Sequence, residues 1–300
     1  MLLNAFIDQG IKALEPLYPM PEARQMILML CEETLGIKNY THIVNPDFEI
    51  SEDDSRMLLA KLEDLSRGMP LQYALGFADF CGLRFKVSPA VLIPRPETEL
   101  LVRDALQQAS RIKRMRAAYG KSAEPVRVLD LCTGSGCIAW SVALNLPGTV
   151  VVGTDISDDA LEVARSQDFA AELKSHQALA PEFVKSDVLD TEQEFPYGPF
   201  DLILSNPPYI LPSEKSQMRV NVLDYEPEVA LFVPQEDPML YYRAVARWSE
   251  RFLAPEGKAL TEINAQLAEE TKAVFKDAGF TGIELIKDYF YKNRFILYYR

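Results

Sequence analysis

From residue 126 to the C-terminus, hydrophobic strand-like stretches alternate with helical ones, and this alternation limits the fold more than any other feature of the sequence. The predicted strands are 126–131, 149–154, 182–186, 200–205, 257–263, 283–287 and 294–299. Strands separated by segments of helix length form βαβ units, and therefore a mainly parallel sheet with helices on both faces. The last two strands are joined by too short a segment for a parallel crossover, so we expect the final strand to run antiparallel.

The residues before this alternation divide into two predicted parts. Residues 1–70 show helical spacing of hydrophobic side chains, with Gly36 ending one helix and Ser51 capping another. This part carries no cluster of catalytic residue types, so we expect a small helical bundle that packs against or recognises a partner. Residues 71–93 contain aromatic and β-branched residues together with Gly76 and Gly82, which predicts a β-hairpin linker.

Composition excludes several classes of protein. The chain has 300 residues, of which 48% are hydrophobic and 25% charged, which is typical of a globular protein with a packed core. Its net charge of −13 disfavours general binding to nucleic acid or anionic membranes, because phosphate contacts need clustered Lys and Arg. We expect no signal peptide and no membrane span. Four Cys without a CxxC pair and only two His give no convincing metal site, so we expect a reduced cytoplasmic protein without a bound metal or a His base.

The segment VRVLDLCTGSGCIAW predicts a buried strand, a tight turn and a helix. Gly134 and Gly136 let the backbone turn sharply and let a ligand approach where a side chain would collide. Asp155 ends the next predicted strand, where a carboxylate can accept both hydroxyls of an adenosine ribose. The loop alone fits either NAD or S-adenosylmethionine. Asp130 favours the second, because a carboxylate can hold an ammonium group but repels a pyrophosphate.

The segment FDLILSNPPYILPS places Asn206, Pro207, Pro208 and Tyr209 at the same predicted edge of the sheet. The two prolines fix the turn, and the side-chain oxygen of Asn206 with neighbouring main-chain carbonyls offers two acceptors for a planar NH2 group. Tyr209 is predicted to give this group a flat face for stacking. An NH2 group held beside a sulfonium methyl donor is an arrangement for N-methylation, in which orientation does most of the work and no general base is required before transfer.

In this order, DLCTGSG, TDIS and SNPPYI resemble the motifs of class I S-adenosylmethionine-dependent methyltransferases. IPRPETE at 93–99 and YEPEVALF at 225–232 are similar to those of the HemK/PrmC-type protein-(glutamine-N5) methyltransferases. The resemblance implies an α/β fold, with a Rossmann-like seven-stranded methyltransferase domain (94–300), a β-hairpin linker (71–93) and an N-terminal helical substrate-recognition domain (1–70). It implies methyl transfer to the glutamine side-chain amide in the Gly-Gly-Gln loop of peptide chain release factors, with S-adenosylhomocysteine as the product.

The resemblance also implies a role for individual residues. The residues implied to bind the donor are Asp130, Cys132, Thr133, Gly134, Ser135, Gly136, Asp155, Ile156, Asp187, Val188 and Asn206. The residues implied to grip the substrate amide or to lie at the mouth of the site are Asn206, Pro207, Pro208, Tyr209, Arg95 and Glu97. Arg95 could either contact the substrate or brace its loop. Three departures from the family pattern are Cys132, where the family usually has Gly, VPQEDPMLYYR at 233–243, which replaces a Gly-rich stretch, and EIN at 262–264, which replaces a more usual EIG and is interpreted as neutral.

Alternative functions remain open from the sequence. A sister group methylates a glutamine of a large-subunit ribosomal protein, and its motif would look the same. DNA adenine-N6 methyltransferases also carry Asn-Pro-Pro-Tyr, although the acidic charge and the lack of a basic recognition domain disfavour them here. An NAD-dependent oxidoreductase needs a proton relay, for which His42 and His176 are poorly placed, and a non-catalytic binding module would be expected to have a broken motif. We expect a monomer with a protein substrate and no direct contact with nucleic acid or membrane.

Overall fold

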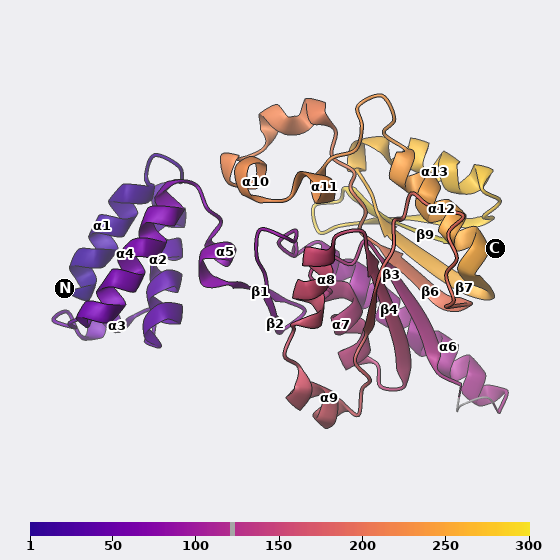
Figure 1. Cartoon of the computed structure of the whole chain (residues 1–300), viewed down its shortest axis with the longest axis horizontal. Coiled ribbons are helices and arrows are strands. Elements are labelled where there is room, and N and C mark those ends of the chain that lie inside the picture. The colour runs from indigo at the N-terminus through magenta and orange to yellow at the C-terminus, as the bar shows by residue number, and fades with distance from the viewer. Residues whose placement is uncertain (121–123) are drawn as a thin grey trace. The chain divides into compact units, whose positions relative to one another are not determined.

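The computed structural model describes residues 1–120 and 124–300, and these form two compact units (Figure 1). One unit comprises Met1–Phe77 with Met218–Tyr225, and the other comprises Ala78–Gln217 with Glu226–Arg300. The sequence alone assigns 218–225 to the C-terminal domain. In the structure this segment groups with the N-terminal helices, because Arg219 pairs with Glu22 and the Tyr225 hydroxyl donates to the Arg67 carbonyl at 3.1 Å.

The N-terminal unit is helical, as its hydrophobic spacing predicts. Its helices are α1 (Leu3–Leu14), α2 (Met20–Leu35), α3 (Thr41–Val44), α4 (Glu52–Ser66), α5 (Leu71–Leu75) and α10 (Val220–Tyr225). The two predicted helix signals are confirmed: Gly36 ends α2 in a left-handed conformation, and the Ser51 hydroxyl accepts the Asp54 amide at the start of α4.

The predicted hairpin is present as β1 (Phe77–Phe80) and β2 (Leu83–Lys86). It is shorter than predicted, because residues 71–75 form helix α5 instead. Pro70 precedes this helix, and Gly76 ends it with a φ of 83°, so both residues serve the helix rather than a strand.

The second unit is built on one mixed sheet. Within residues 78–120 and 124–300, its strands are β3 (Val126–Leu131), β4 (Thr149–Asp155), β5 (Glu182–Lys185), β6 (Phe200–Ser205), β7 (Leu253–Glu262), β8 (Gly282–Lys287) and β9 (Asn293–Tyr299). Their order is β5-β4-β3-β6-β7-β9-β8. The strands β3 to β7 pair in parallel, and β9 is antiparallel to both of its neighbours, which confirms the predicted fold class and the predicted direction of the last strand.

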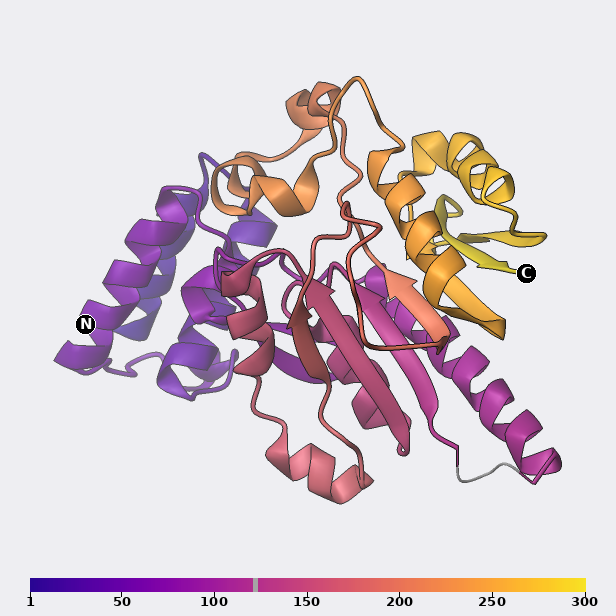
Figure 2. The same ribbon diagram turned by 45° about the vertical axis from the view of Figure 1, so that its right-hand side comes forward.

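Helices cover both faces of this sheet (Figure 2). Side chains alternate along each strand, so Leu202 and Leu204 pack with α6 (Thr98–Ala118), α7 (Cys137–Asn145) and α8 (Asp158–Arg165), whereas Ile203 packs with α12 (Leu240–Phe252) and α13 (Ala268–Asp277). The remaining helical segments of this unit are α9 (Ala170–His176), η1 (Pro212–Gln217), α11 (Glu228–Leu231) and η2 (Ala265–Leu267).

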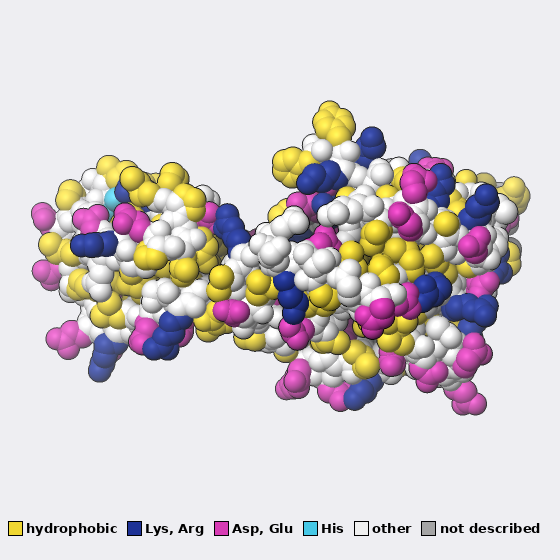
Figure 3. Space-filling model, turned by 90° about the horizontal axis from the view of Figure 1, so that it is seen from above, with side chains coloured by type: hydrophobic (Ala, Val, Ile, Leu, Met, Phe, Trp, Pro, Cys, Tyr) yellow, Lys and Arg dark blue, Asp and Glu magenta, His cyan; other side chains and the backbone are white. Residues whose placement is uncertain are grey.

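The surface carries charges of both signs. On the face seen in Figure 3, acidic and basic side chains lie interspersed among hydrophobic ones. No helix among the described residues has the length and apolar character needed to cross a membrane.

Candidate active site

A cavity of ≈ 1050 Å³, including its open mouth, lies where the carboxyl ends of β3, β4, β5 and β6 meet. This is the edge at which doubly wound sheets bind ligands. The predicted site residues that line it are Arg95, Cys132, Thr133, Gly134, Ser135, Asp155, Ile156, Asp187, Val188, Asn206 and Pro208. The predicted site residues that do not line it are Glu97, Asp130, Gly136, Pro207 and Tyr209.

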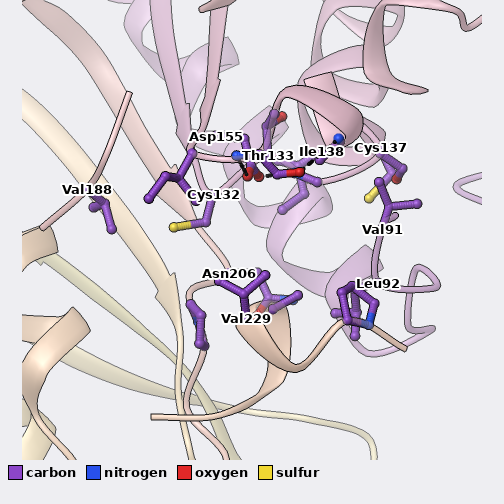
Figure 4. A pocket seen from close by; sticks show the side chains of 18 of the residues that line it. Val91, Leu92, Cys132, Thr133, Cys137, Ile138, Asp155, Val188, Asn206 and Val229 are labelled. Carbon is purple, nitrogen blue, oxygen red and sulfur yellow. Dashed lines mark hydrogen bonds between the residues drawn. The ribbon is translucent and has the colours of Figure 1, made fainter. Parts of the chain in front are cut away.

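The cavity has two halves. We call the lining residues within 132–135, 155–157 and 186–189 the glycine-loop half, and the lining residues within 92–98, 206–208 and 227–230 the Asn206 half. In Figure 4, Asn206 and Val229 lie across the cavity from Cys132, Thr133 and Asp155. A ligand in this space therefore touches both halves at once.

The glycine loop turns tightly between β3 and α7. Gly134 has a φ of 53°, and the position of a side chain there is open, which leaves room for a ligand against the backbone. Gly136 has a φ of 77°, and a Cβ there would sit 2.9 Å from the ring of Phe183, so packing also requires glycine. The loop is therefore open toward the cavity at Gly134 and tightly packed against the protein interior at Gly136.

Cys132 shares this left-handed conformation, with a φ of 61°, although it is not glycine. This explains why glycine is suited to the position. The Cys132 side chain, and not only its backbone, lines the cavity (Figure 4). Burial, with the charges of Asp155 and Asp130, raises the pKa of this thiol well above its usual value, so it stays neutral.

Asp155 joins the loop to the next strand. Its carboxylate accepts the Gly134 amide at 2.9 Å and the Ser157 amide at 3.0 Å. Burial raises the pKa of Asp155, and these amides partly offset the shift. Because a carboxylate has about four acceptor sites, Asp155 keeps acceptor capacity for a ligand in the cavity after its bonds to backbone amides.

Asp130 lies behind the loop rather than in the cavity wall. Its Oδ2 accepts the Thr133 hydroxyl at 2.6 Å, and its Oδ1 is buried without a hydrogen-bond partner among the described residues. Burial raises the pKa of Asp130 to about 7, against the effects of the Thr133 hydroxyl and the nearby Ala139 amide. The geometry therefore gives Asp130 a role in shaping the loop and no direct place in the cavity wall.

The wall next to Asp155 is mainly apolar. Ile156, Val188 and Leu189 line it, and Asp187 is fixed by accepting the Leu189 amide at 2.8 Å. The Ser135 hydroxyl on the loop is buried without a partner among the described residues. An apolar slot with a free carboxylate edge and an unpartnered hydroxyl suits a ligand with a flat ring, a ribose and a polar tail.

The Asn206 half is organised by hydrogen bonds to distant segments. The Asn206 amide Nδ2 lies 3.5 Å from the Thr98 hydroxyl, the outer limit of a hydrogen bond. Thr98 donates to Glu262 at 2.7 Å, and the Tyr209 hydroxyl donates to the other oxygen of Glu262 at 2.9 Å. The Tyr209 hydroxyl therefore points toward β7, its ring packs against the core, and Tyr209 is not among the residues that line the cavity.

Arg95 and Glu226 tie together two segments of the Asn206 half. The Arg95 guanidinium contacts a Glu226 oxygen at 2.7 Å, and the Ile93 amide donates to the other oxygen at 3.2 Å. Glu226 is buried, so its carboxylate depends on these partners. Arg95 braces its loop and also lines the cavity, and the geometry thus supports both roles considered for it.

Sequence reasoning missed Thr98, Glu226 and Glu262 as site residues. Thr98 and Glu226 belong to IPRPETE and YEPEVALF, the two motifs that carry the family resemblance, so a signal for them was present. Glu262 begins the segment EIN at 262–264, where the family usually has EIG, but the sequence does not show that this residue is buried at the end of β7.

Comparison with known proteins agrees with this geometry. The family model "Methyltransferase small domain" matches residues 112–223. A release factor glutamine methyltransferase from Bacteroides thetaiotaomicron is 35% identical over 98% of this chain and 98% of its own length. Proteins of the same name are 34% identical in Flavobacterium psychrophilum, over 99% of this chain and 98% of theirs, and in Chlorobaculum tepidum, over 89% and 87%. This chain belongs to the release factor glutamine methyltransferase family.

Proposed function

We propose that this protein transfers a methyl group from S-adenosylmethionine to the side-chain amide nitrogen (N5) of a glutamine in a peptide chain release factor, the glutamine of its Gly-Gly-Gln loop. The single observation that carries the proposal is the position of Asn206, a side-chain amide on the cavity wall opposite the glycine loop (Figure 4). The names of the relatives support the substrate, because they match over nearly their whole length.

The glycine-loop half fits the donor. Asp155 would accept the ribose hydroxyls, Ile156 and Val188 would cover the adenine, and the loop at 132–136 would follow the methionine part. S-adenosylmethionine supplies a methyl group activated by a sulfonium. The open position at Gly134 is the feature of this loop that such a ligand would use.

The Asn206 half fits a neutral carboxamide. Leu92, Pro208, Val229 and Ala230 line it, and an apolar collar of this kind disfavours a charged side chain. The Asn206 oxygen accepts one hydrogen of the substrate NH2, and a main-chain carbonyl of the Asn-Pro-Pro turn accepts the other. These acceptors hold the nitrogen in place and stabilise the positive charge that develops on it.

A glutamine of a ribosomal protein and an adenine base present the same NH2 chemistry. The choice of a release factor rests on the relatives' names. We further propose that the protein is a cytoplasmic monomer that acts on a protein substrate and does not itself bind nucleic acid.

The proposal is tested by offering the substrates in competition. The chain is incubated with isotope-labelled donor and equal amounts of a release factor, the large-subunit ribosomal proteins and adenine-containing DNA, and peptides are mapped by mass spectrometry. We expect one labelled methyl group on the glutamine of the Gly-Gly-Gln loop. Label on a ribosomal protein or on DNA, with none on the release factor, would overturn the substrate assignment.

A further inference from the structure

A buried carboxylate lies behind Asn206, outside the cavity wall. Glu262, at the end of β7, is 1% exposed and accepts two hydroxyl hydrogens, one from Thr98 at 2.7 Å and one from Tyr209 at 2.9 Å. Thr98, itself buried at the start of α6, lies between Glu262 and the Asn206 amide. Three separate elements of the fold thus meet in one hydrogen-bonded row.

The direction of these hydrogen bonds follows from chemistry. Both hydroxyls donate to Glu262, Thr98 to one carboxyl oxygen and Tyr209 to the other. Thr98 has a single hydroxyl proton, and once that proton points to Glu262, only lone pairs of Thr98 remain for Asn206. The group of Asn206 that faces Thr98 is therefore its NH2, and its oxygen is left for the opposite side.

We propose that Glu262 is a positioning residue that acts through Thr98 to fix the side-chain amide of Asn206 with its oxygen available to the substrate. The catalytic role of this orientation rests on the proposed function, because only a substrate with an NH2 group needs the Asn206 oxygen as an acceptor. It concerns the orientation of Asn206, which can be measured without any substrate.

The orientation matters because an asparagine amide is nearly symmetric in shape. If Asn206 turned over, its NH2 would face the substrate NH2, and two donors would meet without an acceptor. The 2.7 Å hydrogen bond from Thr98 to Glu262 keeps the lone pairs of the Thr98 hydroxyl toward the Asn206 NH2, and this contact opposes the turn. The Asn206–Thr98 distance of 3.5 Å leaves room for the contact to shorten when substrate binds.

The surroundings of Glu262 include one opposing charge. Burial, together with the charge of Glu97, raises the pKa of Glu262 above its usual value, although the Thr98 and Tyr209 hydroxyls and Arg294 of β9 act to lower it. Tyr242 of α12 also faces this carboxylate. Arg294 is held by Asp288 at 3.2 Å, which keeps the positive charge in place.

Four variants test the positioning role. Thr98→Val keeps the shape and removes the acceptor for Asn206, whereas Thr98→Ser keeps the hydroxyl. Glu262→Gln is isosteric, but its NH2 can donate to Thr98 and turn the Thr98 proton toward Asn206. Thr149→Val is the matched control, because Thr149 is equally buried and bonds only to the Leu146 carbonyl at the far end of β4.

We expect Thr98→Val and Glu262→Gln to lower kcat by roughly 10- to 100-fold, the range for a buried polar group that is left without its hydrogen-bond partner. The donor Kd should remain within about twofold, and Thr98→Ser and Thr149→Val should retain near-normal kcat. Equal kcat in Thr98→Val and Thr149→Val would overturn the inference, as would equal losses in Thr98→Ser and Thr98→Val.

A second readout does not depend on activity. In protein labelled with ¹⁵N-asparagine, the Asn206 side-chain NH2 should exchange its hydrogens more slowly than exposed asparagines, and Thr98→Val should speed this exchange while Thr149→Val does not. Unchanged exchange in Thr98→Val would refute the positioning role even if glutamine is methylated. If Thr98→Val speeds the exchange of the Asn206 NH2 as expected, but the parent protein methylates no glutamine, the positioning role stands and only the proposed function is refuted.

Discussion

The two halves of the cavity are built in different ways. In the glycine-loop half, hydrogen bonds join residues close in sequence: Asp155 accepts from Ser157 two positions away and from Gly134 twenty-one positions away. In the Asn206 half, Asn206 and Thr98 are 108 positions apart, and Thr98 and Glu262 are 164 apart. The first half is therefore a property of strand ends and their loops, whereas the second exists only after the whole sheet has formed.

This difference predicts that the two halves can be damaged separately. Asn206→Ala should lower kcat by about 10²–10³-fold, because it removes an acceptor that orients and stabilises the reacting group. Donor affinity measured by calorimetry should stay close to normal. Asn145→Ala is the control, since the Asn145 side chain bonds only to the Ser141 carbonyl on α7. A loss of donor affinity as large as the loss of kcat would show that the halves are not separable.

Asp155→Ala should have the reverse effect. We expect the Kd of the donor to rise about 10- to 100-fold, because hydrogen bonds to a charged group are lost, with a much smaller change in kcat at saturating donor. Asp158→Ala removes a nearby exposed carboxylate that pairs with Lys185 and serves as the control. A donor Kd unchanged by Asp155→Ala would remove this carboxylate from the donor site.

Asp130, behind the glycine loop, makes the free energy of unfolding of the protein depend on pH. Its pKa rises from 3.8 to about 7 in the folded protein, so the folded state binds the proton more tightly than the unfolded chain does. Its contribution to stability is fully present below pH 3.8 and is lost as the pH rises through 7. Asp130→Asn should therefore gain stability relative to the parent protein between pH 5 and pH 8, by roughly 1–3 kcal/mol. Denaturant unfolding of both proteins at pH 5 and pH 8 measures this gain. The same difference in unfolding free energy between the two proteins at both pH values would contradict a cost of burying the Asp130 charge.

Arg95→Met should mainly affect the Asn206 half. It leaves the buried Glu226 carboxylate without its cation, so the segments at 92–98 and 226–230 lose their link. We expect the KM for the protein substrate to rise about tenfold, near 1.4 kcal/mol, with an unchanged donor Kd. Arg84→Met breaks an exposed ion pair with Asp79 and is the control. Equal KM values for the two variants would deny Arg95 a role in shaping the site.

The same difference explains what the sequence could reveal. The strands and the glycine loop could be predicted because hydrophobic runs, glycines and the Asp155 carboxylate follow one another within short segments. The hydrogen bond from the Tyr209 hydroxyl to Glu262 could not be predicted, because nothing near Tyr209 in the sequence indicates that acceptor. Residues 71–75 are predicted as part of the hairpin because of the aromatic and β-branched residues around Gly76 and Gly82, whereas in the structure Gly76 ends a short helix.

Residues 218–225 show the same limit on a larger scale. They lie between Asn206 and Glu226 in sequence, yet they belong to the N-terminal unit through Arg219 and Tyr225. A single ion pair and a single hydrogen bond to a carbonyl leave no periodic pattern. Such long-range partners have to be read from the folded structure.

The most direct test of the account is a crystal structure with the demethylated donor and a peptide containing the substrate glutamine. We predict that the glutamine amide nitrogen lies about 2.7–3.2 Å from the Asn206 Oδ1 and from a main-chain carbonyl of the Asn-Pro-Pro turn, with its free side toward the donor sulfur. A glutamine bound elsewhere in the cavity, or an Asn206 whose nitrogen faces it at the site of transfer, would contradict the account.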